Sequence, residues 1–287
     1  MDSSLLAPFQ VVPSKMILAS VHMILALTSI GLLGVAVGIF LFHSSFKAST
    51  AFRIMGCLSF FELFFQLGFV GLSGFMFAQT GFNETFENIV GILLYSSSYG
   101  IYFTTALLAV HRALSITDVL PIPSLFYQVF LAFILLSTFA QVLGFPFAEQ
   151  IYVFDPEKTI IEGTECLLSS VLGKFSIYFK FSCAGLSLLC YVVSVGFVAY
   201  QKPKKSSSNS NDSQLLSAEM RILATTVVTF LTCALDTLIT NFVLEKVTYN
   251  PTLTSSLAVL VQWNFGMNNL IVYVVLNRRR KNEVVGS

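Results

Sequence analysis

Charged side chains are scarce in this sequence. Only 11% of the 287 residues are Asp, Glu, Lys or Arg, and 55% are hydrophobic, whereas an average soluble domain has about 25% charged residues. The mean hydropathy is +0.79. So few polar groups cannot cover a surface that faces water, which excludes an ordinary soluble protein and makes lipid the expected solvent. The net charge of +1 gives no electrostatic argument for nucleic-acid binding.

Sequence motifs of catalysis are lacking as well. The chain contains no His-Glu-x-x-His, no Gly-x-Ser-x-Gly and no paired aspartates within an apolar run. We therefore expect no enzymatic activity, no cofactor and no metal site. No soluble domain fits between the apolar runs, and the polar segment 201–221 is interpreted as a flexible loop.

Long apolar runs are what the sequence has in abundance. A membrane-spanning helix needs about 20 predominantly apolar residues. Seven runs meet this length, near residues 16–42, 52–77, 89–116, 125–147, 175–200, 222–244 and 253–276. They predict an all-α membrane protein, a bundle of seven transmembrane helices. The first run is too long for a cleaved signal and is expected to be a retained signal anchor.

The distribution of positive charge predicts the orientation of this bundle. Eleven of the 16 lysine and arginine residues fall at one set of helix ends if the N-terminus is outside and the C-terminus is cytoplasmic. We accordingly expect a short extracellular N-terminus (1–15), a seven-helix domain (16–276) and a basic cytoplasmic tail (277–287). The sequon at Asn83 then lies outside, where glycosylation can occur.

Three short motifs, at the ends and in the middle of these runs, resemble a known family. They are "LSFFE" (Leu58–Glu62) in the second run, His111-Arg112-Ala113 at the end of the third, and the "NLIVY" of Asn269–Tyr273 in the seventh. In order and depth they resemble motifs of the rhodopsin-like receptors. With "AFRIM" (Ala51–Met55) opening the second run, the chain most nearly resembles the nematode chemosensory serpentine receptors of class T.

The resemblance implies a role for the cytoplasmic ends of the helices. Arg112 would meet a heterotrimeric G protein, with His111 beside it and Glu219 as its acidic partner, and Asn269 and Tyr273 would take part in activation. His111 stands where the family has an aspartate, which predicts raised basal activity. A lipid-headgroup anchor is the alternative for Arg112, and a surface-facing side chain without a role is the alternative to pH sensing for His111.

The resemblance also implies a disulfide that this chain does not provide. Rhodopsin-like receptors join a cysteine at the outer end of the third span to one in the second outer loop. Cys166 fits the loop position, but Glu87, Asn88 and Ile89 occupy the other. The loop is then held in some other way, or Cys166 is a free or intermolecular thiol.

Charges inside the apolar runs require a partner or a purpose, because each costs roughly 2.5–3.5 kcal/mol on insertion scales. Glu62 stands where the resemblance places a sodium-binding aspartate. Gln66 lies one turn further on the same face, and Asn268 lies at a compatible depth. These residues predict an ion- or water-binding site, or alternatively polar contacts between helices with a protonated carboxyl.

Lys180 and Asp236 lie at similar depth in sequential runs, so we expect them to form an ion pair or water network at the floor of an outer pocket. A purely structural pair is the alternative. The other candidates for the wall of this pocket are Thr240, Trp263, Tyr95 and Tyr99. A mostly apolar cavity with a few polar groups suits a small organic ligand, although aromatic stripes more often serve helix packing.

Together these features predict a G-protein-coupled chemosensory receptor for a small organic ligand. It is expected in the plasma membrane as a multi-pass protein, in the cilium of a sensory neuron by resemblance, and able to form receptor oligomers. The alternatives are a degenerate receptor that acts as a partner or trafficking subunit, and a transporter or channel. No continuous polar path crosses the runs, which weighs against the last.

Overall fold

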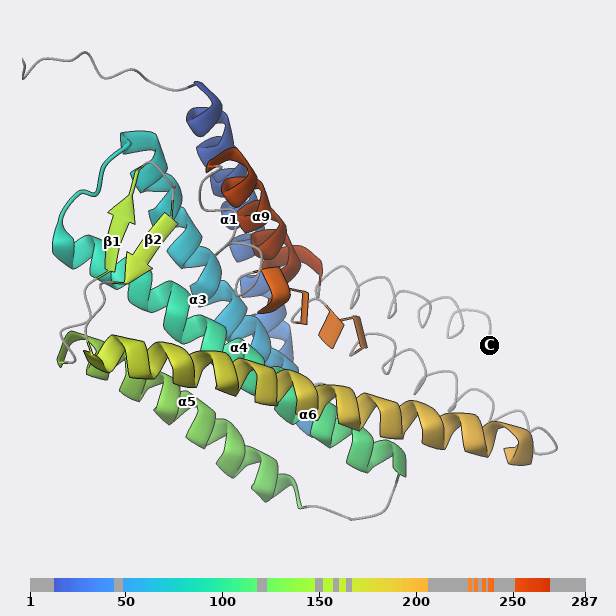
Figure 1. Cartoon of the computed structure of the whole chain (residues 1–287). Helices are drawn as coiled ribbons and strands as arrows, with labels where there is room; N and C mark the ends of the chain where they lie inside the picture. The colour runs from blue at the N-terminus through green and yellow to red at the C-terminus, as the bar shows by residue number, and fades with distance from the viewer. Residues whose placement is uncertain are drawn as a thin grey trace, which may run out of the picture.

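The computed structural model describes residues 13–43, 49–117, 123–147, 152–156, 160–163, 167–205, 227–228, 230–231, 234–235, 237–239 and 251–268. This part of the chain is almost entirely helical (Figure 1). The long helices are α1 (Pro13–Phe42), α3 (Thr50–Ala78), α4 (Glu84–Thr117), α5 (Ser124–Phe147) and α6 (Leu167–Lys205). Helix α9 (Pro251–Trp263) continues into η3 (Asn264–Asn268), a stretch of π-helix.

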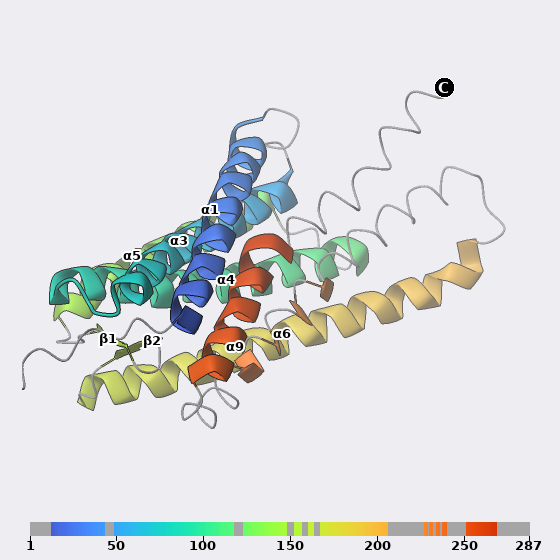
Figure 2. The same cartoon turned by 90° about the horizontal axis from the view of Figure 1, so that it is seen from above.

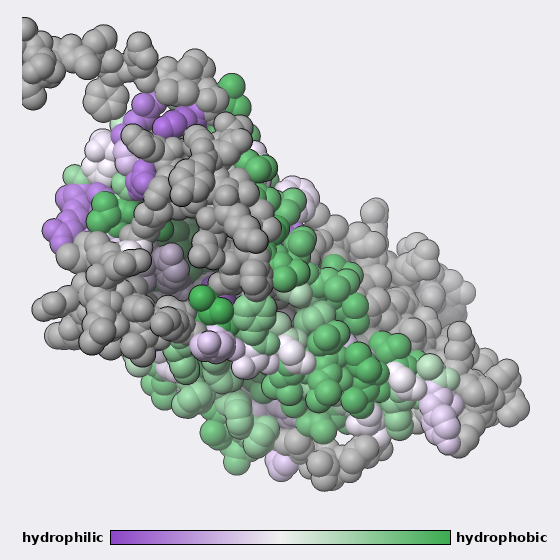
Figure 3. Space-filling view, viewed as in Figure 1, coloured by the Kyte–Doolittle hydropathy of each residue, from purple (hydrophilic) through white to green (hydrophobic). Residues whose placement is uncertain are grey.

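Five of these helices are long and apolar enough to cross a membrane. They coincide with the first five predicted spans. The sixth predicted span, 222–244, is described only at a few positions, and the seventh only as far as residue 268. The exposed faces of α5 and α6 are apolar, and hydrophilic residues gather near the start of α4 (Figure 3). Apolar outer faces are what helices in lipid require.

Helix α4 lies at the centre of the bundle. It packs against α3, α5 and α6 and against both strands, while α1 packs on α3 and on α9 (Figures 1 and 2). Most of α3 and α4 is buried inside the protein, whereas α1, α5 and α6 expose most of their length. The core is rich in phenylalanine from α3, among them Phe61, Phe65, Phe69 and Phe75.

A two-stranded antiparallel hairpin covers one end of the bundle. Strand β1 (Tyr152–Asp155) pairs with β2 (Ile160–Gly163), with Tyr152 opposite Gly163. Tyr152 and Phe154 are buried and Val153 between them is exposed, as the two-residue period of a strand requires. We call this end, where the hairpin meets the start of α4, the hairpin end, and the opposite end, near Arg112, the far end.

The start of α4 is set by an N-cap. The Oδ1 atom of Asn83 accepts a hydrogen bond from the backbone N–H of Phe86 at 2.7 Å, which satisfies one of the donors that the first turn of a helix leaves open. Before it, α3 ends at Ala78 and is followed by its C-cap residue Gln79, whose φ of 53° is left-handed. This pair of signals turns the chain at the hairpin end.

Candidate functional site

Side chains from the first turn of α4 hold the hairpin in place. The Oε2 atom of Glu87 accepts a hydrogen bond from the backbone N–H of Phe154 at 2.7 Å, and Oδ1 of Asn88 accepts one from the N–H of Tyr152 at 2.6 Å. The ammonium of Lys15 in α1 donates to the carbonyl of Pro156 at 2.6 Å. We call Glu87 and Asn88 with these two bonds the hairpin clamp.

The clamp occupies the position where the family resemblance places a cysteine. The sequence identified Glu87 and Asn88 only as residues that are not cysteine, and left the means of holding the loop open. Cys166 lies outside the described residues. Cys57, Cys183 and Cys190 are free thiols. Among the described residues, the two hydrogen bonds attach the hairpin to α4.

The inner face of the hairpin lies directly on α4. The ring of Tyr152 stacks on Tyr95 with centroids 4.9 Å apart. It also fills the space beside Gly91, where an added Cβ would lie 2.3 Å from Cγ of Tyr152. Burial raises the pKa of the Tyr152 phenol well above its usual range, and the nearby Tyr95 and Tyr99 raise it further. Tyr152 is therefore a neutral hydrogen-bonding group at physiological pH.

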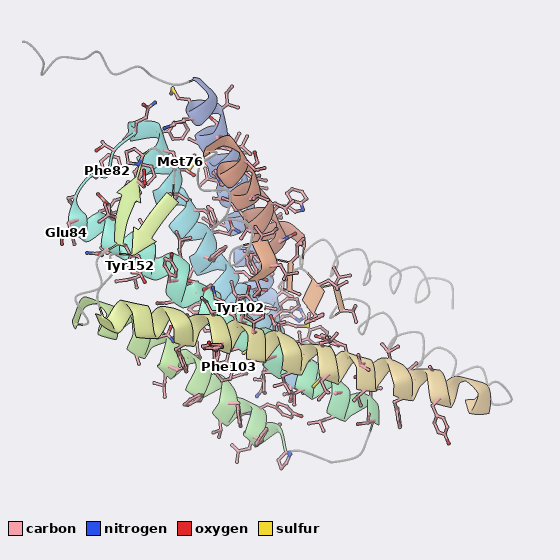
Figure 4. All side chains as sticks on the ribbon, viewed as in Figure 1. Met76, Phe82, Glu84, Tyr102, Phe103 and Tyr152 are labelled. Carbon is pink, nitrogen blue, oxygen red and sulfur yellow. The ribbon has the colours of Figure 1, made fainter. Side chains whose placement is uncertain are left out.

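Beneath the hairpin, a polar group gathers around Tyr102. This tyrosine lies two turns beyond Tyr95 on the same face of α4, about 10 Å further along the helix axis. Its hydroxyl oxygen accepts a hydrogen bond from the Thr237 hydroxyl at 2.8 Å. The Lys180 ammonium of α6 lies over its ring, 5.4 Å from the centroid, which is within the range of a cation–π interaction. Tyr102 lies in the middle of α4, where α6 crosses it (Figure 4).

The sequence placed Lys180 in this group but paired it with Asp236. Asp236 and Thr240 lie outside the described residues, whereas their neighbour Thr237 is described and contacts Tyr102. The described contact of Lys180 is with Tyr102, so the lysine lies where α6 meets α4. Tyr102 lies on the same face of the third run as Tyr95 and Tyr99, and nothing in the sequence distinguished it from them.

Aromatic rings pack near Tyr102. Phe179, the neighbour of Lys180 in α6, lies 5.6 Å from Tyr99 and 5.2 Å from Phe103 between ring centroids. From the opposite side, Phe265 of η3 lies edge-on to Tyr102 at 6.4 Å. Trp263 is 40% exposed.

A buried polar cluster ties α1 and α3 to α9. Gln262 of α9 bonds to Gln66 of α3 and to His22 of α1, and these three side chains are at most 1% exposed. Glu62, one turn before Gln66, is 1% exposed. The sequence predicted a meeting of the second and seventh runs through Gln66 and Asn268; the described contact is made through Gln262, and the Asn268 side chain is not described. His22 was missed, although a histidine inside an apolar run is a signal in itself.

At the far end, His111 and Arg112 lie in the last two turns of α4. Both are half-buried. His111 packs edge-on against Tyr127 of α5, with ring centroids 4.7 Å apart, so the expectation of a surface-facing side chain is wrong. Ala109, Tyr191 of α6 and Phe230 form a second small apolar cluster nearby. Glu219, Asn269 and Tyr273 lie outside the described residues.

Two of the remaining predictions concern the surface and metal binding. Asn83 is exposed at the hairpin end, and its Nδ2 atom is not used in the N-cap bond. Among the described residues, no three His, Cys, Asp or Glu side chains are grouped so that they could hold a metal ion.

A bundle of apolar helices around a central helix, capped by a hairpin, defines a multi-pass helical membrane protein. The structure is similar to the crystal structure of squid rhodopsin, with a TM-score of 0.76 over 97% of this chain and 82% of that chain, at 17% sequence identity. It is one of 336 matching chains of solved structures. The fold is therefore rhodopsin-like. No protein-family model matches the sequence, and no curated protein matches it.

Proposed function

We propose that this chain is a G-protein-coupled chemosensory receptor. A small organic ligand would bind between the hairpin and Tyr102, and a heterotrimeric G protein would bind at the far end. The rhodopsin-like fold supports the receptor class. The observation that carries the proposal is the group of Tyr102, Lys180 and Thr237, which brings a hydroxyl, a phenol and an ammonium together in the middle of the apolar bundle.

The composition of this group supports a ligand with an apolar body and one or two polar atoms. Phe179, Phe103 and Phe265 offer ring faces and edges for apolar contact. The Lys180 ammonium is a hydrogen-bond donor, so the polar atom that it best complements is an acceptor such as a carbonyl or carboxylate oxygen. The Tyr152–Tyr95 stack would close the site on the hairpin side.

The orientation belongs to the same proposal. The hairpin end faces the outside and the far end faces the cytoplasm, as the distribution of lysine and arginine favours. This arrangement puts the ligand group on the outer side of Arg112 and places Asn83 where it can be glycosylated. Plasma-membrane and ciliary placement and receptor oligomers are further parts of the proposal that rest on resemblance.

The test is G-protein dissociation in cells that express the chain, measured at rest and with a panel of small organic compounds. Wild type is compared with Arg112→Ala and Arg112→Lys at matched surface level. Arg53→Ala, which removes an arginine at the start of α3, is the control. A signal that both Arg112 variants reduce and Arg53→Ala keeps supports coupling at the far end, because lysine keeps the charge but not the planar guanidinium. Equal signals from all variants would contradict it.

A further inference from the structure

The side chain of Gln262 has one orientation that satisfies its neighbours. Its Nε2 atom lies 2.9 Å from the backbone oxygen of His22 and 3.2 Å from Oε1 of Gln66. A backbone carbonyl only accepts hydrogen bonds, so the amide nitrogen must face it. Both hydrogens of this amide are then donated, one to α1 and one to α3.

This orientation determines the protonation of the His22 ring. Nδ1 of His22 lies 2.5 Å from Oε1 of Gln262. An amide oxygen only accepts, so Nδ1 carries a hydrogen and donates it. The ring is held in this setting by stacking on Phe69 of α3, with centroids 5.5 Å apart and planes at 11°. His22 therefore positions Gln262 from two sides, through its ring and through its own backbone oxygen.

Gln66 completes the network in the same way. Its Nε2 donates to the backbone oxygen of Gln262 at 3.1 Å, so its Oε1 is the atom that accepts from Gln262. The result is a set of four hydrogen bonds among three residues that are at most 1% exposed, two of them between side chains and two from a side chain to a backbone oxygen. We call His22, Gln66 and Gln262 the amide lock.

Directly after the amide lock, the same interface is incomplete. The π-helix η3 begins at Asn264, two residues beyond Gln262. Asn264 Nδ2 and Ser29 Oγ of α1 are buried without a hydrogen-bond partner among the described residues. Gly266 packs so closely that an added Cβ would lie 2.4 Å from Ser29 Oγ and 2.6 Å from Gln66 Nε2. An unpaired buried polar group is costly, and π-helical turns are rare and found mostly at functional sites.

We propose that the amide lock holds η3 in its π-helical winding and that release of the lock lets this segment rewind during activation. The hydrogen bonds of Gln262 hold the present arrangement of the interface. The buried polar atoms of Asn264 and Ser29, which lack partners among the described residues, favour a second arrangement in which they gain them. An α-helix turns about 100° per residue, and a π-helix, with its i→i+5 hydrogen bonds, turns less per residue. Converting η3 to α-helix therefore rotates the chain segments on its two sides relative to each other. The mechanical part of the proposal, that the amide lock holds η3 in its winding, stands on the described contacts. The link to activation rests on the proposed function.

The mechanical part is tested by hydrogen–deuterium exchange on the full chain in lipid nanodiscs. His22→Leu removes the ring donor, whereas His22→Asn keeps an N–H in the region of Nδ1. We expect exchange at residues 263–268 to accelerate roughly tenfold in His22→Leu, because losing an interhelical hydrogen bond lowers the free energy needed to open this segment. His22→Asn should restore most of the protection, and peptides from α4 should not change.

The control is Ser20→Ala, on the same helix, because within the described part of the chain the Ser20 hydroxyl donates to the backbone oxygen of Met16, one turn earlier in α1. If His22→Leu does not reach the membrane, Gln66→Met takes its place, because it removes the two bonds that Gln66 makes. The same acceleration of exchange at residues 263–268 is then expected. Unchanged exchange at 263–268, or equal exchange in His22→Leu and His22→Asn, overturns the proposal.

The link to activation is tested by resting G-protein dissociation at matched surface level. We expect His22→Leu to raise it several-fold and His22→Asn to leave it near wild type. If exchange responds but neither wild type nor any variant signals, the lock stands and the proposed receptor function is contradicted. If wild type signals through Arg112 but His22→Leu changes neither resting signal nor exchange, the proposed function stands and the lock is overturned.

Discussion

The carboxylate of Glu87 in α4 accepts a hydrogen bond from the backbone N–H of Phe154 in the hairpin, with Oε2 and N 2.7 Å apart. Asn88 makes the equivalent bond to Tyr152. Glu87 lies 67 positions before its partner and Asn88 lies 64 positions before its own. Together they attach the hairpin to the central helix of the bundle. In both bonds the acceptor is a side-chain oxygen of α4 and the donor is a backbone N–H of the hairpin. Each bond can therefore be removed by one substitution in α4 that leaves the sequence of the strands unchanged.

Removing the Glu87 acceptor should loosen the hairpin. Glu87→Ala leaves the buried N–H of Phe154 without a partner, and a hydrogen bond to a charged group contributes about 1.5–3 kcal/mol. We expect Glu87→Ala to lower the thermal midpoint of the purified protein in nanodiscs by several degrees. Glu87→Gln, which keeps an acceptor oxygen, should lose less. Equal midpoints for the two variants would contradict the clamp.

The close packing of Tyr152 beside Gly91 should hold the hairpin on α4 as firmly as the clamp does. In Gly91→Ala the new Cβ would meet the Tyr152 side chain at 2.3–2.7 Å, so the hairpin has to move away from α4. We expect this variant to expose the hairpin to limited proteolysis. Gly185→Ala is the matched control, since a Cβ there meets nothing within 4 Å and alanine favours a helix over glycine. Identical cleavage rates in both variants would argue against the Tyr152 packing.

Alkaline pH should weaken the protein through Tyr152. Its phenol has a pKa raised above the ordinary value of 10.0 by burial and by two neighbouring tyrosines. In the unfolded chain the phenol ionises near that ordinary value, so its contribution to stability is complete below about pH 10 and falls as pH rises further. Thermal midpoints from pH 8 to 11.5 should fall more steeply for wild type than for Tyr152→Phe. Parallel curves would refute this assignment.

Reducing agents should have little effect on the hairpin. The clamp consists of hydrogen bonds, and the described cysteines are free thiols. We expect Cys166→Ser to keep surface level and thermal midpoint within a degree or two of wild type, with or without dithiothreitol. A large loss in Cys166→Ser, reproduced by reduction of the wild type, would show that a disulfide also holds this loop.

The ligand group should be separable from the coupling site. Given the proposed function, Tyr102→Phe removes the acceptor of the Thr237 bond, and Lys180→Met removes the ammonium over the ring. Either change should raise the ligand concentration for half-maximal G-protein dissociation by about tenfold, the equivalent of about 1.4 kcal/mol, at unchanged surface level. Tyr200→Phe, at a tyrosine that is 64% exposed in α6, is the control. An equal response in all three variants would place the ligand elsewhere.

The sequence by itself determined the helical spans and their solvent. Apolar runs of 20 or more residues have one stable form in lipid, because every backbone N–H and C=O must be satisfied within the segment. The first five runs therefore coincide with α1, α3, α4, α5 and α6. The depth of Lys180 along its run led the sequence analysis to pair it with Asp236, which lies outside the described residues.

Only the tertiary structure decided which polar residues meet. His22, Gln66 and Gln262 are separated by up to 240 positions, and their pairing depends on the rotation of three helices about their axes, which composition does not set. The hairpin clamp has the same origin: Glu87 and Asn88 carry no motif, and their partners are backbone N–H groups, which every residue except proline has. Contacts made to the backbone leave no trace in the identity of the partner, so packing alone reveals them.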